Sequence, residues 1–390
     1  MDMIYFTEMK VCFETFGCRL NKAEALQMEA DYLSDGWEVT TKHSDASLFI
    51  IRGCSVTARA QYECEKLIAH LKRRYPAAGI KIYGCLPNAS KPSKPLKPLE
   101  PLPVRTARAY LKAQDGCAGK CTFCIIPKFR GESRSEPFTD LLDRAKRFID
   151  AGYHEIVVTG CNLALYASEG KRLPDLVSAL AGLDTGCRIR LGSLEPGACA
   201  RETVHAMAEA PNVCRFLHLP VQSGSNKILK EMRRPYVVED VEDTVTLASK
   251  LMPDLGLGCD LMTGFPGESR LDFAATKGLL KRLPFVHAHV FPFSERPGTL
   301  AAGLPRPIAK DVRSARARLL ADEMRSKRRK FAKTFVGKIV EIVVEDEKTG
   351  RGWTGEYLPC EPLSGSFVRK SIARIFVTKT RDDLLLGNIR

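Results

Sequence analysis

Three cysteines lie close together in the middle of the chain and could bind a metal cluster. Cys117, Cys121 and Cys124 have the spacing C-x3-C-x2-C, and Gly116 and Gly119 allow the backbone to wrap closely around a bulky group. Thiolates are the usual ligands of iron–sulfur clusters, so three of them on a four-iron cube leave one iron open to an outside ligand. A structural zinc site would need a fourth Cys or His, and none lies nearby in the sequence. The spacing therefore favours a [4Fe–4S] cluster with one open iron.

A second set of cysteines follows three apolar stretches near the N-terminus. Cys18, Cys54 and Cys85 each come directly after a glycine, at the end of a stretch with the composition of a β-strand. If these strands are parallel neighbours, the three thiols meet at one edge of a sheet. The alternative is three separate buried thiols, because free cysteine is often buried. Beside the first trio, convergence at a second metal site is the better interpretation.

The composition is that of a globular protein. The chain has 390 residues, of which 44% are hydrophobic and 27% charged, which predicts two or three domains and excludes a fibrous or wholly disordered protein. No apolar run reaches the roughly 18–20 residues that span a bilayer. Residues Met1–Lys10 also lack the layout of a secretory signal, so we expect a cytoplasmic protein with no membrane partner.

Cysteine content and net charge narrow the function further. In a reducing compartment, clustering among the 14 cysteines indicates metal binding or catalysis rather than disulfides. The net charge of +14 fits a polyanionic partner such as nucleic acid.

The first elements that must position these cysteines form a small domain followed by a linker. Residues 1–86 are predicted to be a small α/β domain, with helices over Lys22–Leu33 and Ala58–Arg74 between the strands that end in cysteine. Residues 87–104 contain Pro92, Pro95, Pro98 and Pro101, which recur at every third position. This spacing is typical of a semi-rigid polyproline II tether.

Residues 105–310 alternate predicted strands and helices, the pattern of parallel strands with right-handed crossovers. Five or six such units fit a partial (β/α) barrel better than a closed eight-fold one, and ligands of such folds bind at the carboxyl ends of the strands. We expect strands over Glu155–Thr159, Arg188–Leu194, Phe216–Val221, Gly258–Met262 and Ala288–Phe293. We expect helices over Phe138–Ala151, Pro174–Leu183, Arg201–Ala210, Val238–Leu251 and Ser269–Leu283.

The remaining residues form a helical connector and a last domain. Residues 311–334 belong to a long basic helix, Ala309–Thr334, which is either a solvated connector or a nucleic-acid contact. Residues 335–390 lose the helical period and predict a small β-barrel, a class that often holds nucleic acid. We expect its strands over Ile339–Glu345, Phe367–Ile372 and Arg374–Thr380. The predicted fold class is therefore α/β: a small α/β N-terminal domain, a central partial (β/α) barrel and a C-terminal small β-barrel.

The C-x3-C-x2-C stretch ahead of a strand–helix alternation resembles the signature of radical S-adenosylmethionine (SAM) enzymes. Along nearly its whole length the chain resembles one family of them, the methylthiotransferases, with a three-cysteine domain, a radical SAM domain and a TRAM-like domain in that order. The motifs that carry the resemblance are Gly17-Cys18-Arg19-Leu20-Asn21, Gln114-Asp115-Gly116-Cys117, Cys124-Ile125-Ile126-Pro127, Ser193-Leu194-Glu195-Pro196 and Gly264-Phe265-Pro266-Gly267-Glu268. The chain departs from the family pattern at Arg52-Gly53 and in a short segment between Cys85 and Cys117.

The resemblance implies two [4Fe–4S] clusters and SAM as cofactors. Cys117, Cys121 and Cys124 would hold the cluster that cleaves SAM to a 5′-deoxyadenosyl radical. In the same way, the family likeness gives Cys18, Cys54 and Cys85 an auxiliary cluster, on which sulfur is methylated before its transfer. The residues that we place near SAM are Phe123, Gly160, Asn162, Glu195, Gln222, Ser223 and Gly264. The plainer alternatives are a surface carboxylate for Glu195, ordinary turns for the glycines and packing for Phe123.

The resemblance also implies a substrate and partners. Residues His289–Thr299 resemble the subgroup that adds a methylthio group to C2 of N6-threonylcarbamoyladenosine beside the tRNA anticodon. The related alternatives are isopentenyladenosine in tRNA or a ribosomal-protein aspartate, and an alternative of another class is a non-catalytic iron–sulfur or zinc RNA-binding protein. The implied partners are the tRNA anticodon stem-loop and an electron donor such as flavodoxin or ferredoxin. Candidate RNA contacts are Lys338, Arg351, Trp353, Tyr357, Arg369, Lys370 and Arg374, with Arg52 as a candidate reader of the modified base.

Overall fold

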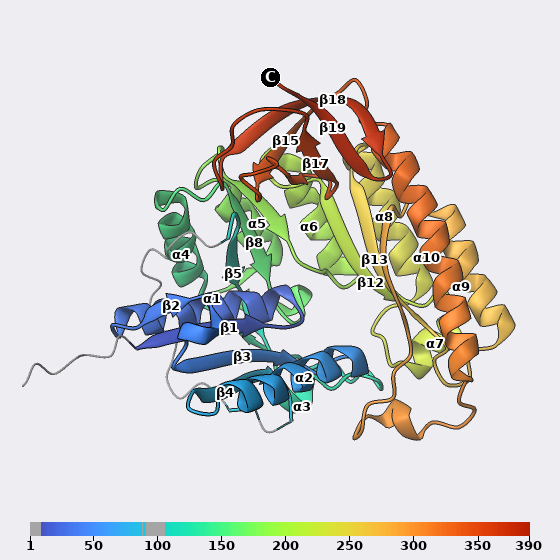
Figure 1. Cartoon of the computed structure of the whole chain (residues 1–390). Coiled ribbons are helices and arrows are strands. Elements are labelled where there is room, and N and C mark those ends of the chain that lie inside the picture. Colours follow the sequence, from blue (N-terminus) through green and yellow to red (C-terminus); the bar gives the residue numbers. More distant parts are fainter. Residues whose placement is uncertain (1–8, 88, 91–105) are drawn as a thin grey trace, which may run out of the picture.

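The computed structural model describes residues 9–87, 89–90 and 106–390, so the predicted linker lies almost entirely outside the described residues. Three parts follow one another along the chain: an N-terminal sheet with helices, a central set of parallel strands and a C-terminal barrel (Figure 1). This arrangement confirms the predicted α/β class. Within the described ranges, no helix is both long and apolar enough to cross a membrane.

The N-terminal part is a parallel sheet with the strand order β2-β1-β3-β4. Alternate residues of β3 face opposite sides, so that Phe49 and Ile51 pack with residues of α2 while Leu48 and Ile50 pack toward α1. The predicted strands and both predicted helices are confirmed. The bounds are β1 Lys10–Thr15, α1 Arg19–Ser34, β2 Glu38–Thr40, η1 His43–Asp45, β3 Leu48–Cys54, α2 Ala58–Arg74 and β4 Gly79–Cys85.

Six parallel strands form the central part, as two sheets with the orders β11-β8-β5 and β12-β13-β14. Isolated bridges from Ile189 to Val213 and from Ser193 to His218 join the sheets, which makes the partial barrel that the sequence predicts. The strand bounds are β5 Ala109–Lys112, β8 Glu155–Thr159, β11 Arg188–Leu191, β12 Phe216–Gln222, β13 Gly256–Thr263 and β14 His287–Pro292. The first strand, β5, is absent from the sequence prediction because four residues are too few to show a period.

Helices cover the outer side of these strands and contribute to one large apolar core. In β13, Leu257, Cys259 and Leu261 belong to this core, so Gly258 and Asp260 point to the inside of the partial barrel. The helix bounds are α4 Phe138–Asp150, α5 Leu173–Ala181, α6 Ala198–Glu209, α8 Val238–Leu251 and α9 Arg270–Arg282. Shorter elements are β6 Gln114–Asp115, α3 Ile126–Arg130, β7 Arg134–Ser135, η2 Leu163–Leu165, β9 Ala167–Ser168, β10 Lys171–Arg172, α7 Asn226–Glu231 and η3 Leu300–Gly303.

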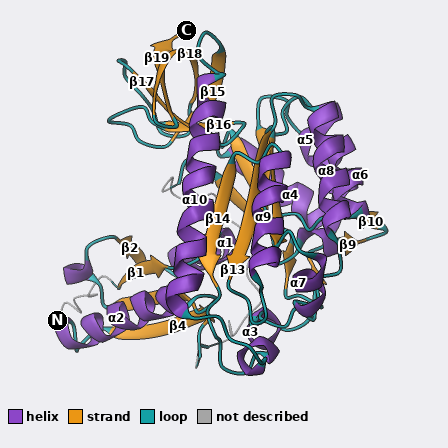
Figure 2. Ribbon diagram, turned by 90° about the vertical axis from the view of Figure 1, so that its right-hand side faces the viewer, coloured by secondary structure: helices purple, strands orange, loops and turns teal. Residues whose placement is uncertain are grey.

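A long helix, α10 (Lys310–Lys333), lies along β14 and reaches the C-terminal barrel (Figure 2). Leu320 and Met324 join the central core, while Ala332 joins the core of the barrel. The barrel is closed in the order β15-β16-β17-β19-β18. Its strands are β15 Ile339–Val344, β16 Gly352–Thr354, β17 Pro359–Pro362, β18 Ile372–Arg381 and β19 Leu384–Ile389. The predicted strand over Phe367–Ile372 is wrong: only Ile372 is in a strand, as the first residue of β18, and the residues before it include a turn in which Lys370 has a φ of 74°.

Buried arginines fasten this barrel to the central strands. Glu155 accepts hydrogen bonds from Nε of Arg188 (3.1 Å) and Nε of Arg190 (2.7 Å). Burial by itself would raise the pKa of Glu155, but these guanidinium groups hold it well below its usual value. The same arginines donate to barrel carbonyls, Arg188 to Glu341 (2.8 Å) and Arg190 to Thr354 (2.8 Å). The barrel is therefore anchored by charge-assisted hydrogen bonds near the amino-terminal ends of β8 and β11.

Candidate active site with two cysteine trios

The three N-terminal cysteines lie at the carboxyl ends of adjacent parallel strands. Cys54 and Cys85 are direct partners in the register of β3 and β4, and Cys18 follows the neighbouring strand β1. Gly17 has a φ of 90°, and a Cβ atom at this position would lie 2.7 Å from the Cβ of Cys54, so only glycine allows the close approach. Cys54 and Cys85 are buried, whereas Cys18 is exposed. The structure thus brings the second trio together at one sheet edge.

The first trio lies on the loop between β6 and α3. The backbone N–H of Gly119 donates to Sγ of Cys117 (3.3 Å), and that of Ile126 donates to Sγ of Cys124 (3.4 Å). Such N–H···S hydrogen bonds favour the thiolate form and tune bound clusters. Burial raises the pKa of the Cys124 thiol to about 11, so metal binding there must displace a proton.

Arg130, at the end of α3, links the two trios. Its Nε donates to Sγ of Cys85 (3.0 Å), and its two Nη atoms each lie 3.0 Å from a carboxylate oxygen of Glu24 in α1. Its Nη1 also donates to Asp115 (2.9 Å), which directly precedes the loop of the first trio. Lys112 donates to both carboxylates, at 2.9 Å to Glu24 and 2.7 Å to Asp115. One buried ionic network therefore spans the boundary between the two cysteine sites.

The charges of this network are not balanced by its carboxylates alone. Arg52 also pairs with Glu24, so three cations face two carboxylates. Burial first and Arg130 second lower the pKa of Arg52 to about 10, while the charge of Cys85 opposes this shift. Burial raises the pKa of Asp115, but Lys112 and Arg130 outweigh it and hold that pKa far below its usual value. Burial raises the pKa of the Cys85 thiol and Arg130 opposes this shift, so a thiolate at Cys85 in a bound cluster would supply the missing negative charge. The expectation that Arg52 reads a base is wrong, because its side chain is buried in this network.

Three of the residues predicted to contact SAM gather beside the first trio. Glu195 accepts a hydrogen bond from Nδ2 of Asn162 (2.9 Å) and an ion pair from Arg234. Arg234 in turn donates from Nη1 to Sγ of Cys121 (3.1 Å), which ties this polar group to the cysteine loop. Gly160 lies at the end of β8, where a Cβ atom would lie 3.0 Å from three atoms of Gln114, the residue that holds the loop.

A fourth predicted residue, Gln222, ends β12 at a positive φ of 63° with its side chain buried. Among the described residues, its Oε1 atom has no hydrogen-bond partner. A buried acceptor without a donor is costly, so this atom fits contact with a bound polar ligand.

The other three predicted SAM residues have packing roles. The Oγ of Ser223 lies 3.4 Å from the Oγ1 of Thr276 in α9, on the helix side of its strand. A Cβ atom at Gly264 would lie 2.2 Å from Arg313, so glycine is needed there for the approach of α10. Phe123 packs against a small apolar cluster beneath the cysteine loop. The contact of these three residues with SAM stays a prediction.

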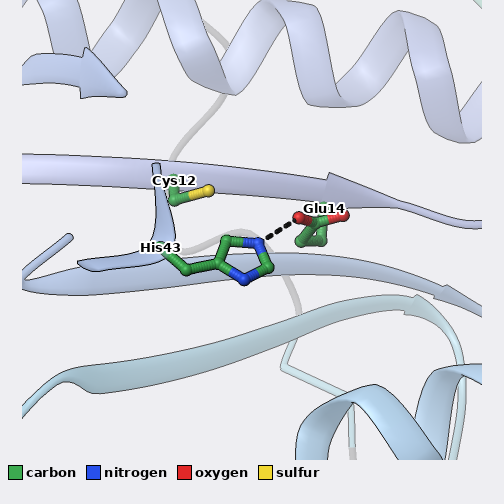
Figure 3. Close-up of side chains that lie close together, drawn as sticks. All are labelled: Cys12, Glu14 and His43. Carbon is green, nitrogen blue, oxygen red and sulfur yellow. Dashed lines mark hydrogen bonds and ion pairs between the residues drawn. The ribbon is translucent and has the colours of Figure 1, made fainter. Parts of the chain in front are cut away.

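Donor spacing separates a zinc ion from a larger cluster. Tetrahedral zinc with Zn–S bonds of about 2.3 Å places its sulfur ligands about 3.8 Å apart. Across residues 9–87, 89–90 and 106–390, two groups of three or more His, Cys, Asp or Glu side chains have donor atoms within 4.8 Å of one another, and neither includes a cysteine of the two trios. These groups are Cys12, Glu14 and His43 (Figure 3) and His218, Asp260 and His289. In neither trio do all three sulfur atoms lie within 4.8 Å of one another, a wider spacing than zinc ligands have and one that leaves room for a larger iron–sulfur cluster.

Three residues that shape this site, Gln114, Arg130 and Arg234, were not predicted from the sequence to have a role in it. Gln114 donates to the carbonyl of Gly116 (2.7 Å) and accepts from the backbone N–H of Asn162 (2.9 Å), which fixes the start of the cysteine loop. Gln114 lies in a family motif, and Arg130 comes six residues after Cys124. Their nearness in sequence to the cysteine loop could have indicated that both residues contact it. No local pattern in the sequence indicated Arg234, because its partners are distant in the sequence.

The candidate RNA contacts of the last domain fall into two groups. Lys338, Arg351 and Arg374 are exposed, and Arg369 is half-buried. Trp353, Tyr357 and Lys370 instead face the central part, where the Nζ of Lys370 lies 3.6 Å from the ring centre of Tyr153 and Trp353 stacks on Tyr357. These three residues contribute to domain docking.

Comparison with known proteins agrees with an iron–sulfur site of the radical SAM type. Residues 111–280 match the radical SAM superfamily, and residues 10–100 match the uncharacterized protein family UPF0004. The threonylcarbamoyladenosine tRNA methylthiotransferase MtaB of Aquifex aeolicus is 30% identical over 87% of this chain and 93% of its own length. The chain belongs to the radical SAM methylthiotransferase family. A [4Fe–4S] cluster and SAM are accordingly its cofactors.

Other relatives of this methylthiotransferase family member carry the names of two different tRNA modification enzymes. MtaB of Bacillus subtilis is 28% identical over 93% of this chain and 94% of its own length. The tRNA-2-methylthio-N(6)-dimethylallyladenosine synthase of Aquifex aeolicus is 29% identical over 87% of this chain and 89% of its own length. Among solved structures, the radical SAM methyltransferase TsrM of Kitasatospora setae has the same fold, with a TM-score of 0.55, 14% identity and coverage of 76% of this chain and 77% of that one.

Proposed function

We propose that this protein adds a methylthio group to C2 of N6-threonylcarbamoyladenosine in tRNA. The observation that carries the proposal is the presence of two open cysteine trios, Cys18–Cys54–Cys85 and Cys117–Cys121–Cys124, joined through Arg130. The two relatives named MtaB, which resemble this chain over most of its length, support threonylcarbamoyladenosine as the substrate. The segment His289–Thr299 supports the same choice by its resemblance to that subgroup.

The residues of the first trio would hold the cluster at which SAM binds. A [4Fe–4S] cluster with SAM supplies a radical able to activate an aromatic C–H bond, which acid–base groups cannot do. Arg234 donates to Cys121 and orients Glu195, while Asn162 fixes the other carboxylate oxygen of Glu195. Glu195 and the Oε1 of Gln222, which has no hydrogen-bond partner among the described residues, would accept hydrogen bonds from donor groups of bound SAM.

The residues of the second trio would hold the auxiliary cluster. Arg130 and Lys112 hold the pKa of Asp115 below its usual value, and the Nε–H of Arg130 donates to Sγ of Cys85, which favours a thiolate ligand at that position. Cys18 is the one exposed thiol of this trio, so the open side of the site lies near it. Sulfur transfer to RNA is thus expected on the side of Cys18.

RNA binding would use the exposed cations of the last domain and of α10. The exposed cations are Lys338, Arg351 and Arg374 on the barrel and Arg318 and Lys330 on the helix. Contacts of such residues with phosphates release counterions, so binding falls steeply with salt. The anticodon stem-loop is the expected ligand, and a flavodoxin or ferredoxin is the expected electron donor.

The second candidate substrate is dimethylallyladenosine in tRNA. Relatives named for that reaction are 28–29% identical to this chain, which is close to the identity of the MtaB relatives. Overall likeness therefore does not separate the two substrates.

A nucleoside digest of tRNA, analysed by mass spectrometry, tests the proposal. In a strain that lacks this protein, the 2-methylthio derivative of threonylcarbamoyladenosine should disappear, and the wild-type chain should restore it. A variant with Cys18, Cys54 and Cys85 changed to alanine should not restore it. Loss of the dimethylallyl derivative instead would favour the second candidate, and an unchanged profile would contradict both.

A further inference from the structure

A thiol, a carboxylate and an imidazole meet on one face of the N-terminal sheet. Cys12 and Glu14 are two residues apart in β1, so their side chains lie on the same face of the sheet. His43 is the first residue of η1, the short helix that follows β2. One donor atom from each of these three side chains, the Cys12 group, lies within 4.8 Å of the other two (Figure 3). The group contains no cysteine of the two trios.

Aromatic packing and the sheet fix the positions of these donor atoms. The ring of His43 makes edge contacts with Phe49, with ring centres 5.5 Å apart, and with Tyr75, with ring centres 6.3 Å apart. Phe49 of β3 is also the register partner of Cys12, so the same side of the sheet supports both the thiol and the imidazole. Nε2 of His43 lies 2.7 Å from Oε1 of Glu14. The three donors are thus held together before any ion arrives, which lowers the cost of binding one.

The charges and the burial of the Cys12 group suit a divalent cation. Among the described residues, Glu14 forms no ion pair with a lysine or an arginine, and its ion-pair partner is His43. A thiolate at Cys12 and the carboxylate of Glu14 together carry two negative charges, which balance a divalent ion, and a neutral imidazole adds a third donor. Cys12 is only 2% exposed, whereas the side chains of His43 and Glu14 are 29% and 31% exposed. An ion therefore has an entry path, and water can complete its coordination.

The donor types and their spacing select zinc. Thiolate and imidazole are ligands that zinc prefers, whereas magnesium and calcium take oxygen ligands. Zinc bonds of about 2.0–2.3 Å place tetrahedral donor atoms about 3.4–3.8 Å apart. In the Cys12 group the closest pair is 2.7 Å apart and all three donors lie within 4.8 Å, so small side-chain movements reach that spacing. The plainer alternative is a histidine–glutamate ion pair beside an unrelated buried thiol, because free cysteine is often buried.

The other three-donor group, His218, Asp260 and His289, is already closed by its own hydrogen bonds. Nη1 of Arg328 lies 2.9 Å from Nδ1 of His287, and a guanidinium can only donate, so the proton of a neutral His287 is on Nε2. That Nε2 lies 3.1 Å from Nε2 of His289, whose own proton is then on Nδ1, 3.1 Å from Oδ1 of Asp260. A cation would have to displace this proton. Among the described residues, no arginine donates to the carboxylate or the imidazole of the Cys12 group.

We propose that Cys12, Glu14 and His43 form a zinc site, with water as the fourth ligand. On binding, the thiol of Cys12 releases its proton to solvent and its sulfur bonds to the ion, with no change of oxidation state. The ion ties η1 to β1, the strand that leads to Cys18, and so braces the domain that carries the second trio. The inference depends on neither the tRNA substrate nor SAM.

Zinc content of the full-length chain tests the proposal. The chain is first reconstituted with iron and sulfide, so that the cysteines of both trios are occupied, and zinc sulfate is then added and the excess removed by gel filtration. The wild-type chain should retain one zinc ion. Cys12→Ala and His43→Gln should each lose it, because each removes one of the three protein ligands.

His289→Gln is the matched control, because it removes a histidine from the other three-donor group and leaves the Cys12 group intact. This variant should retain the zinc ion. Iron content equal to that of the wild-type chain shows that the N-terminal domain of each variant still folds, and the half-exposed position of His43 makes His43→Gln the milder of the two changes. Zinc that stays in Cys12→Ala and His43→Gln, or that is lost from His289→Gln alone, overturns the proposal.

X-ray absorption at the zinc K edge identifies the ligands of the retained ion. The Cys12 group predicts one sulfur at about 2.3 Å and three nitrogen or oxygen ligands at about 2.0–2.2 Å. Three sulfur ligands would place the zinc in a cysteine trio, and no sulfur ligand would place it away from Cys12; either result overturns the proposal. Failure of the tRNA nucleoside test would leave the zinc result standing, so the two claims can be judged separately.

Discussion

Replacing Arg130 by glutamine tests whether one buried guanidinium joins the two cysteine sites. The side chain of Arg130 is only 7% exposed, and it makes hydrogen bonds to Cys85, Asn21, Glu24 and Asp115. Glutamine keeps a polar side chain but removes the charge and the forked donors. Glu24 then keeps Lys112 and Arg52 as partners, and Asp115 keeps Lys112 and the exposed Arg134.

The expected cost follows from the burial of this network. Breaking a buried ion pair by removing one partner costs about 3–5 kcal/mol, since the remaining charge stays desolvated. For a folding unit of 150–250 residues, each kcal/mol lowers Tm by about 2–4 °C, which gives a loss of about 6–20 °C. Arg134→Gln is the matched control, because Arg134 pairs with the same Asp115 at 3.9 Å but its side chain is 64% exposed. Its loss should cost at most about 1 kcal/mol.

Differential scanning calorimetry of the cluster-free chain, with both variants side by side, measures this difference. A Tm for Arg130→Gln within 2 °C of that for Arg134→Gln would refute the view that Arg130 is an internal link. On reconstitution, Arg130→Gln should also weaken the auxiliary cluster, because the Nε–H donor to Cys85 (3.0 Å) is lost. Iron content of this variant should therefore fall more than that of the control.

Three further results are expected. Glu155→Gln should destabilise the chain by about 3–5 kcal/mol, because the arginines that anchor the barrel lose their shared carboxylate. The variant should also expose α10 to limited proteolysis, and an unchanged cleavage pattern would contradict this expectation. The pKa of Asp115 is lowered in the folded state, so its contribution to stability is complete above about pH 4–5 and is lost as the pH falls through the folded pKa. Asp115→Asn should accordingly flatten the fall of Tm between pH 5 and pH 3, and an equally steep fall would count against the network. Arg234→Gln should lower the reduction potential of the cluster at the first trio, because the donor to Cys121 (3.1 Å) is lost, and a redox titration that shows no change would exclude this role.

Much of the fold could be predicted from local sequence, and local spacing also singled out the candidate cysteine ligands. The strand residues Leu48–Ile51 and the helix Val238–Leu251 show clear periods, and cysteine spacing depends on neighbouring residues only. The convergence of Cys18, Cys54 and Cys85 could be argued because parallel strands of one domain end at the same edge.

Contacts between distant segments could not be predicted in this way. Arg234 and Cys121 are 113 residues apart, and nothing in the local pattern selects Arg234 from other arginines. Arg52 lies beside a cluster cysteine and was interpreted as a base reader, but its strand position turns it into the ionic network. Gly264 and Ser223 lie at strand ends, where ligands often bind, but their contacts with Arg313 of α10 and Thr276 of α9 could not be predicted from the local sequence.

Quantification of iron with ⁵⁷Fe Mössbauer spectroscopy after anaerobic reconstitution tests the central claim most directly. Two cubane clusters predict about eight irons per chain, and about four after either trio is changed to alanine. Cys161→Ser is the control, because this thiol lies 3.7 Å from Asp115 between the sites but is assigned to neither, so about eight irons should remain. Four irons in the wild-type chain, or no loss in the Cys18–Cys54–Cys85 variant, would contradict the presence of two cluster sites.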